Sequence, residues 1–68
     1  MKSTLGNNIK RLRLENNMTQ RELADSLNIS IQAVSKWETA RSYPDVSMLP
    51  PLSKLLSVSI DELFRENK

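Results

Sequence analysis

Two short helical patterns follow one another closely between Thr19 and Glu38, in the stretch TQRELADSLNISIQAVSKWE. The first pattern opens with a capping box, in which the Thr19 hydroxyl and the Glu22 carboxylate can each accept a bond from an N–H group that the first helical turn leaves unpaired. Met18 before the cap and Leu23 after it have the spacing of a hydrophobic staple. The sequence therefore predicts a helix that is capped by Thr19.

The second pattern begins after a short turn. In this turn Asn28 is the residue best able to take the left-handed conformation, and Ser30 is the expected cap of the helix that follows. At about 100° per residue, Ala33, Val34 and Trp37 fall in one sector, which we expect to face the core. The opposite sector has no acidic side chain and consists of Ile31, Gln32, Ser35, Lys36 and Thr39. A surface helix with a solvated face has the same pattern, but two helices at this spacing are the layout of a helix-turn-helix.

Helical periodicity continues before this unit. Leu5, Ile9 and Leu12 have core spacing and predict a first helix over about residues 5–16. Leu14 falls on the side opposite Leu5, where it is either solvated or packed on the carboxyl-terminal segment. In the polar loop after the second pattern, Tyr43 is expected to pack against the edge of the core.

Two more helices are predicted in the last third of the chain. A stripe of apolar residues indicates a fourth helix capped by Ser47, and Pro50 and Pro51 fit its first turn because residues there need no N–H group. A second capping box, from Ser59 to Glu62, predicts a short fifth helix. The apolar residues of that helix are Ile60, Leu63 and Phe64. The predicted fold is all-α, a compact bundle of about five short helices.

Length and composition narrow the classes of function. Sixty-eight residues suit one domain, and we expect a single domain over residues 1–68 with no attached domain that senses a small molecule. Cys and His are both absent, which removes the usual ligands of a metal site and the commonest general base. We therefore expect no enzyme activity, cofactor or metal. No segment matches a membrane span or a signal peptide, so a cytoplasmic location without membrane contact is expected.

The charges are unevenly distributed, although the net charge is only +2. Residues 1–43 carry seven Lys and Arg against four Asp and Glu, a net +3, whereas residues 44–68 carry three against four, a net −1. The basic part of the chain is the part with the helix-turn-helix pattern. It would attract a polyanion, although a mixed charged surface also serves solubility.

Four segments of the chain match, in order, those of a known family. The segments are LGNNIKRLR (5–13), MTQRELADSLNIS (18–30), QAVSKWE (32–38) and LSVSIDELF (56–64). The chain resembles the Cro and phage-repressor (lambda-repressor-like) helix-turn-helix family, also called the xenobiotic-response-element family. The resemblance covers nearly the whole chain. It implies a DNA-binding domain whose helix-turn-helix spans 19–38 and whose recognition helix spans 30–39.

The resemblance also implies roles for individual residues. In the family, the arginine that matches Arg13 often pairs with the glutamate that matches Glu38, and each lies at the edge of an apolar stripe, where a charge gains from a partner. Gln32 stands where family members often have a base-contacting glutamine. Thr39-Ala40 replaces the Asn-Gly of many members, so the turn after the recognition helix is a departure from the family. Arg41 remains placed for a phosphate contact there.

Together these observations predict a transcriptional regulator that binds double-stranded DNA, and we expect a repressor that binds a palindromic operator as a homodimer through residues after Pro44. Because a recognition helix presents its amino end to base edges, the expected base-contacting residues are Ser30, Ile31, Gln32, Ser35 and Lys36. The expected phosphate contacts are Gln20, Arg21, Thr39, Arg41 and Lys10. Gln20 would act through its side chain and the helix amino end. The alternative is a protein-interaction module on the same scaffold, such as an antitoxin or antirepressor.

Overall fold

The computed structural model describes residues 4–66, and all of its regular structure within that range is helical. The elements are α1 (Thr4–Glu15), α2 (Gln20–Leu27), α3 (Ile31–Glu38), the 3-10 turn η1 (Val46–Met48), α4 (Leu49–Leu56) and α5 (Ile60–Leu63). The predicted all-α bundle of five short helices is confirmed, and α1 begins and ends one residue earlier than predicted. Residues 1–3 and 67–68 of the predicted domain lie outside the described residues.

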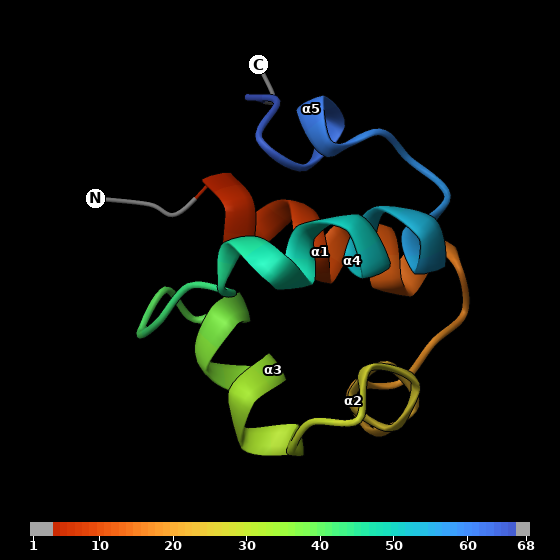
Figure 1. Ribbon diagram of the computed structural model, residues 1–68, viewed down its shortest axis with the longest axis vertical. Helices are drawn as coiled ribbons and strands as arrows, with labels where there is room; N and C mark the ends of the chain where they lie inside the picture. The colour runs from red at the N-terminus through yellow and green to blue at the C-terminus, as the bar shows by residue number, and fades with distance from the viewer. Residues whose placement is uncertain (1–3, 67–68) are drawn as a thin grey trace.

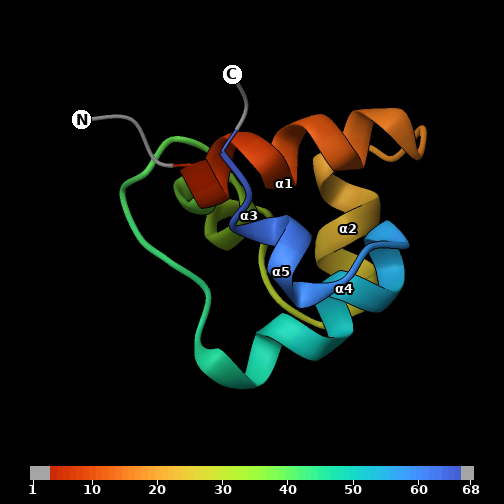
Figure 2. The same cartoon turned by 90° about the horizontal axis from the view of Figure 1, so that it is seen from above.

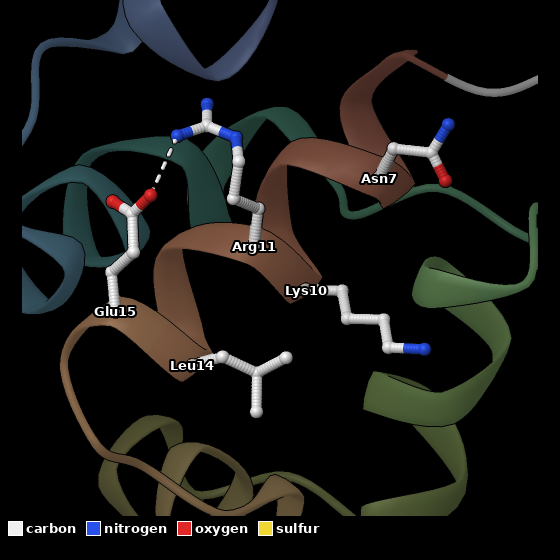
Figure 3. Close-up of a pocket in the computed structure, with 5 residues that line it drawn as sticks. All are labelled: Asn7, Lys10, Arg11, Leu14 and Glu15. Carbon is white, nitrogen blue, oxygen red and sulfur yellow. Dashed lines mark hydrogen bonds and ion pairs between the residues drawn. The ribbon is translucent and has the colours of Figure 1, made fainter.

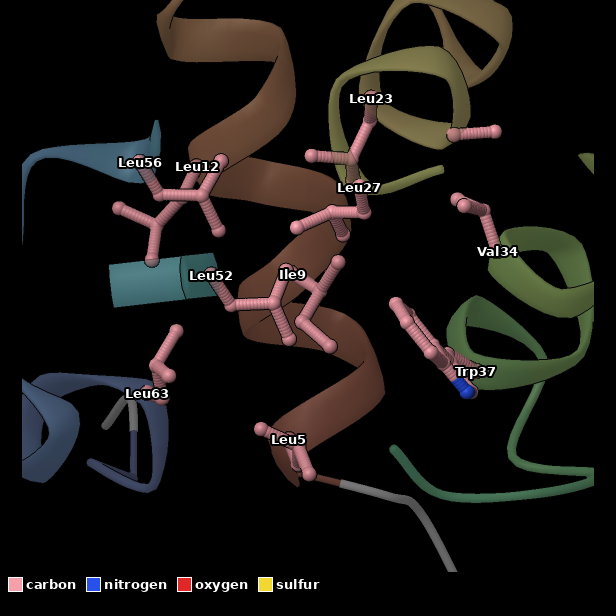
Figure 4. Packing of buried hydrophobic residues seen from close by; sticks show 11 residues of the cluster. Leu5, Ile9, Leu12, Leu23, Leu27, Val34, Trp37, Leu52, Leu56 and Leu63 are labelled. Atoms are coloured by element: carbon pink, nitrogen blue, oxygen red, sulfur yellow. The ribbon is translucent and has the colours of Figure 1, made fainter. Parts of the chain in front are cut away.

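The helices surround one hydrophobic core. The helices α2 and α3 lie at one end of the bundle, α5 lies at the other, and α1 and α4 lie between them (Figures 1 and 2). The fully buried residues Ile9, Leu23, Val34, Leu52 and Leu63 come from five different helices and meet in this core (Figure 4). The helix α3 packs against both α1 and α2. The apolar side of α3 therefore faces the core, and its opposite side faces solvent.

Four helices end at a residue in the left-handed conformation, and none of these residues is glycine. The residues are Asn17, Asn28, Ala40 and Ser57, with φ between 58° and 63°. After each one, a backbone N–H reaches back to the last turn of the helix, as Ile29 N does to Ala24 O at 3.0 Å. The left-handed conformation predicted for Asn28 is confirmed. Asparagine tolerates this conformation because its short polar side chain can bond locally, whereas alanine adopts it only at a cost.

The prediction that Ser47 caps the fourth helix is wrong. The Asp45 carboxylate accepts from Ser47 Oγ at 2.7 Å and from Ser47 N at 3.2 Å, so Asp45 caps η1 instead. The bond from the Ser47 hydroxyl, and after it the bond from the Ser47 backbone N–H, lower the pKa of the Asp45 carboxyl below its usual value. The helix α4 then begins at Leu49 without a side-chain cap, and Pro50 and Pro51 lie in its first turn as predicted. The 3-10 turn was missed because its three residues are too short for a periodic pattern.

The structure corrects the predicted capping box of α5 and the predicted place of Tyr43, and it decides the position of Leu14. In α5 only Leu63 is buried, because a helix of one turn can direct few side chains inward, and Ile60 and Phe64 are exposed. Ser59 Oγ accepts from Glu62 N at 3.2 Å, but the Glu62 carboxylate lies 3.3 Å from Arg65 Nη1, so the structure gives only the hydroxyl half of that capping box.

Tyr43 and Leu14 are also exposed, at 64% and 55%. Tyr43 therefore does not pack on the core edge, and the choice left open for Leu14 is decided for solvent.

A buried side chain that the sequence analysis did not single out joins α1 to the end of the chain. Asn8 is 1% exposed, and its Nδ2 donates to Leu63 O at 2.9 Å and to Arg65 O at 2.7 Å. These carbonyls belong to the last turn of α5 and the segment after it, which no further helical turn can satisfy. Asn8 therefore fixes α5 on α1.

Candidate nucleic-acid interface

The helix pair α2–α3 is built from the local devices that the sequence predicts. Thr19 Oγ accepts from Glu22 N at 3.0 Å while Glu22 Oε1 accepts from Thr19 N at 2.8 Å, so the capping box of α2 is confirmed. Ser30 Oγ accepts from Ala33 N at 3.2 Å and caps α3. Between the two helices, left-handed Asn28 turns the chain. Local bonds thus place the start of α3 directly after the end of α2.

The orientation of α3 separates a core side from a polar side. Val34 and Trp37 are buried as predicted, and Ala33 is half-buried beside them. On the other side, Gln32 and Lys36 are exposed. Ser30 at the cap is also exposed, and Ser35 is half-buried. The polar side chains predicted to read bases therefore lie together on the outer surface of α3.

Ile31 departs from its predicted place on the exposed face. Its side chain is half-buried and packs against the core cluster. As the first residue of α3, it lies where the turn brings α3 close to α2, and an apolar side chain there gains by covering the core edge. Part of the Ile31 side chain remains accessible to solvent, so this residue lies at the boundary between the core and the surface.

Four basic side chains, from α1, α2, α3 and the turn after α3, have no ion-pair partner among residues 4–66. They are Lys10, Arg21, Lys36 and Arg41, and all four are exposed. Lys10 extends from α1 beside a shallow open hollow, on the side where α3 packs (Figure 3). Their charges are therefore not neutralised by the protein itself and can act on an external anion.

Arg13 and Glu38, which the resemblance pairs, are in direct contact. Arg13 Nε donates to Glu38 Oε2 at 2.7 Å, and Nη2 donates to Oε1 at 3.1 Å. The two side chains are only 8% and 3% exposed. Arg13 Nη1 also donates to Met18 O at 2.8 Å. The pair therefore joins α1, the link before α2, and the last residue of α3.

Two of the predicted phosphate contacts have protein partners already. Gln20 Nε2 donates to Glu38 Oε1 at 3.0 Å. Thr39 Oγ1 donates to Ser35 O at 2.9 Å, so its hydroxyl proton is used within the carboxyl end of α3. A phosphate needs a donor, and a hydroxyl has only one. The geometry therefore gives less support to Thr39 than to the free basic side chains.

The turn after α3 keeps the left-handed conformation although it has no glycine. Ala40 has a φ of 63°, Arg41 N donates to Lys36 O at 2.8 Å, and Ala40 N donates to Trp37 O at 3.2 Å. These two bonds define a Schellman motif, in which glycine is the usual left-handed residue. Thr39-Ala40 therefore turns the chain as a glycine would, and the exposed Arg41 follows immediately.

Because the Cβ atom of Ala40 is crowded in this conformation, we expect Ala40→Gly to raise the free energy of unfolding by about 1 kcal/mol. Urea unfolding of the two proteins measures the difference. Ala24→Gly is a control with the opposite expected sign, because Ala24 lies inside α2 and is fully buried, so glycine there should destabilise by at least about 1 kcal/mol. Destabilisation at both positions would contradict the assigned strain.

The fold and the surface around α3 define a helix-turn-helix protein. A profile of the family described as "Helix-turn-helix" matches residues 9–63, and the chain belongs to this family, the Cro and phage-repressor type. It is 46% identical over 56 residues to the HTH-type transcriptional activator BcrR of Enterococcus faecalis. It is 36% identical over 47 residues to the cryptic phage CTXphi transcriptional repressor RstR of Vibrio cholerae, and 35% identical over 65 residues to the HTH-type transcriptional regulator ImmR of Bacillus subtilis.

These relatives are longer than the chain. The matches cover 82%, 69% and 96% of this chain but only 28%, 42% and 51% of BcrR, RstR and ImmR. What the chain shares with them is the helix-turn-helix region. Within residues 4–66, no helix is long and apolar enough to cross a membrane.

Proposed function

We propose that this protein is a sequence-specific DNA-binding transcriptional regulator that inserts α3 into the major groove of its operator. The observation that carries the proposal is the polar surface of α3, on which Gln32 and Lys36 are exposed, together with basic side chains on α1, α2 and the turn after α3 that form no ion pair within the described residues 4–66. A duplex needs both features, because base edges are read by hydrogen bonds and phosphates attract unpaired cations. Such a regulator would act in the bacterial cytoplasm, where the chromosome is.

The proposed reading residues are those at the amino end and outer side of α3. Gln32 can bond both N6 and N7 of an adenine, and Lys36, one turn later, can reach the acceptors of a guanine or a phosphate. Ser30 and Ser35 can bond either kind of base edge. Ile31 has a narrower role, because only its uncovered part can touch a thymine methyl group.

The proposed phosphate contacts flank this reading surface. Lys10, Arg21 and Arg41 supply free cations from α1, α2 and the turn after α3. Gln20, as the first residue of α2, contributes its backbone N–H group, which the helix itself leaves unpaired. Such contacts fix the register of the protein on the duplex without selecting a sequence. Thr39 can contribute only if its hydroxyl leaves Ser35 O.

We further propose a homodimer on a palindromic operator, in which the interface is formed mainly by residues after Pro44. Exposed apolar side chains of that region support this proposal, namely Val46, Ile60 and Phe64. One reading helix offers few base contacts, and a dimer doubles them on an inverted repeat. Repression is the simplest result, because a bound dimer excludes polymerase without a further contact. BcrR is named an activator, however, so whether this protein represses or activates transcription has to be measured separately from DNA binding.

Selection from random duplex DNA, followed by salt titration of the selected operator, tests the proposal. We expect an inverted repeat with half-sites about 34 Å apart, which is one helical turn. With three free cations on phosphates per protomer, the slope of log K against log salt should be about −5 for a dimer and about −3 for a monomer. Failure to enrich any sequence, with binding indifferent to salt, would instead support a module that covers a partner protein.

A further inference from the structure

The side-chain amide of Gln20 has a partner inside the protein. Its Nε2 donates to Glu38 Oε1 at 3.0 Å, and Gln20 is half-buried. Because an ionised carboxylate only accepts hydrogen bonds, the amide must present its nitrogen, and not its oxygen, to Glu38. The orientation of the Gln20 side chain is therefore set by the protein before any DNA arrives.

Glu38 gathers donors from two other helices. Arg13 of α1 donates to both of its oxygens, at 2.7 and 3.1 Å, and Gln20 of α2 adds the third bond. The Glu38 side chain is only 3% exposed, so little water can replace a lost donor. The amide of Gln20 is therefore part of what satisfies a buried charge at the end of α3.

The position of this bond gives it a geometric consequence. The turn through Asn28 joins the last residue of α2 to the first residue of α3, whereas Gln20 is the first residue of α2 and Glu38 the last of α3. The turn thus closes one end of the helix pair, and the Gln20–Glu38 bond closes the other. Two helices that are joined at both ends cannot change their mutual angle without breaking one of these connections.

We propose that Gln20 is a positioning residue for DNA reading, whose amide holds α3, through Glu38, at the angle at which α3 enters the major groove. This inference rests on the proposed function. A phosphate contact by the same amide is unfavourable for two reasons. Leaving Glu38 removes a donor from a buried carboxylate, and sharing Nε2 brings a second anion close to that carboxylate.

Positioning and phosphate contact predict different effects on DNA binding. A phosphate contact carries no sequence information, so its loss weakens binding to every duplex equally. A change in the angle of α3 removes base contacts, which only the operator provides. The informative quantity is therefore the ratio of the Kd for a shuffled duplex to the Kd for the operator.

The test is Gln20→Met, which keeps the length of the side chain and removes its donor. The probes are the operator selected from random DNA and a shuffled duplex of the same length and composition, at one salt concentration. We expect the operator Kd to rise about tenfold, as for loss of one bond to a charged group, and the shuffled Kd to change by less than about twofold. Partial unfolding would raise both Kd values equally and leave their ratio unchanged.

Two further variants complete the test. Gln20→Lys restores a donor to Glu38, so the ratio should recover. In a Glu38→Met background, which has no acceptor for the amide, Gln20→Met should change the ratio no further. An unchanged ratio in the folded Gln20→Met protein, whether or not both Kd values rise together, overturns the positioning role. If the unsubstituted protein itself prefers no duplex, the proposed function fails instead.

Discussion

We expect Arg13→Ala to lower the free energy of unfolding by about 3–5 kcal/mol, the typical cost of removing one partner of a buried ion pair. Among the described residues, the substitution leaves the Glu38 carboxylate, which is only 3% exposed in the unsubstituted protein, with the Gln20 amide as its one remaining donor. It also removes the donor to Met18 O, in the link before α2. Since small domains have about 5–15 kcal/mol in total, this one change would leave a substantial part of the protein unfolded. Urea unfolding measures it.

A double-mutant cycle separates this pair from its surroundings. Arg13→Met with Glu38→Met removes both charges and keeps apolar volume, so the double variant should be more stable than the sum of the two single losses predicts. The matched control is Arg11 and Glu15 on α1, which lie 3.2 Å apart but are 40% and 58% exposed. Their coupling should be at most about 0.5 kcal/mol. Equal coupling in both pairs would show that burial is not the cause.

The parts of this molecule that are predictable from sequence are those fixed by neighbouring residues. The capping box of Thr19 and Glu22, the left-handed Asn28 and the prolines at the start of α4 each depend on contacts within a few positions. Periodicity likewise identified the buried faces of α1 and α3. Periodicity does not say whether anything covers an apolar side chain, however. For this reason the apolar residues Leu63 and Phe64 could not be told apart from the sequence, although Leu63 is buried and Phe64 is exposed.

Bonds between distant polar residues were harder to predict. The partners of Asn8 are backbone carbonyls 55 and 57 residues away, and no side-chain pattern identifies a backbone acceptor. Gln20 had two available partners, an external phosphate and the Glu38 carboxylate, and only the packing of α2 on α3 brings the second within 3.0 Å. The contact of Arg13 with Glu38 was anticipated through the family resemblance, because position at the edge of a helix face does not by itself select a partner.

For sequence reading, we expect Gln32→Ala to reduce operator affinity by about 1–3 kcal/mol and to relax the base preference at one position of each half-site. Gln32 is exposed on the outer side of α3, near its amino end, where a helix in the major groove meets base edges. Its amide can both accept from and donate to an adenine, and alanine can do neither. Repeating the selection from random DNA with the variant shows which position loses its preference.

The matched control for this substitution is Arg41→Ala, which removes a free cation just beyond the same helix. A phosphate contact carries no sequence information, so Arg41→Ala should leave the selected motif intact and weaken binding to operator and shuffled duplexes alike. It should also reduce the slope of log K against log salt by about 1 per protomer. Gln32 is neutral, so Gln32→Ala should leave the salt slope unchanged while it alters the motif. If Gln32→Ala instead preserves both motif and affinity, the reading surface lies on other residues, and Lys36 and Ser35 become the next to substitute.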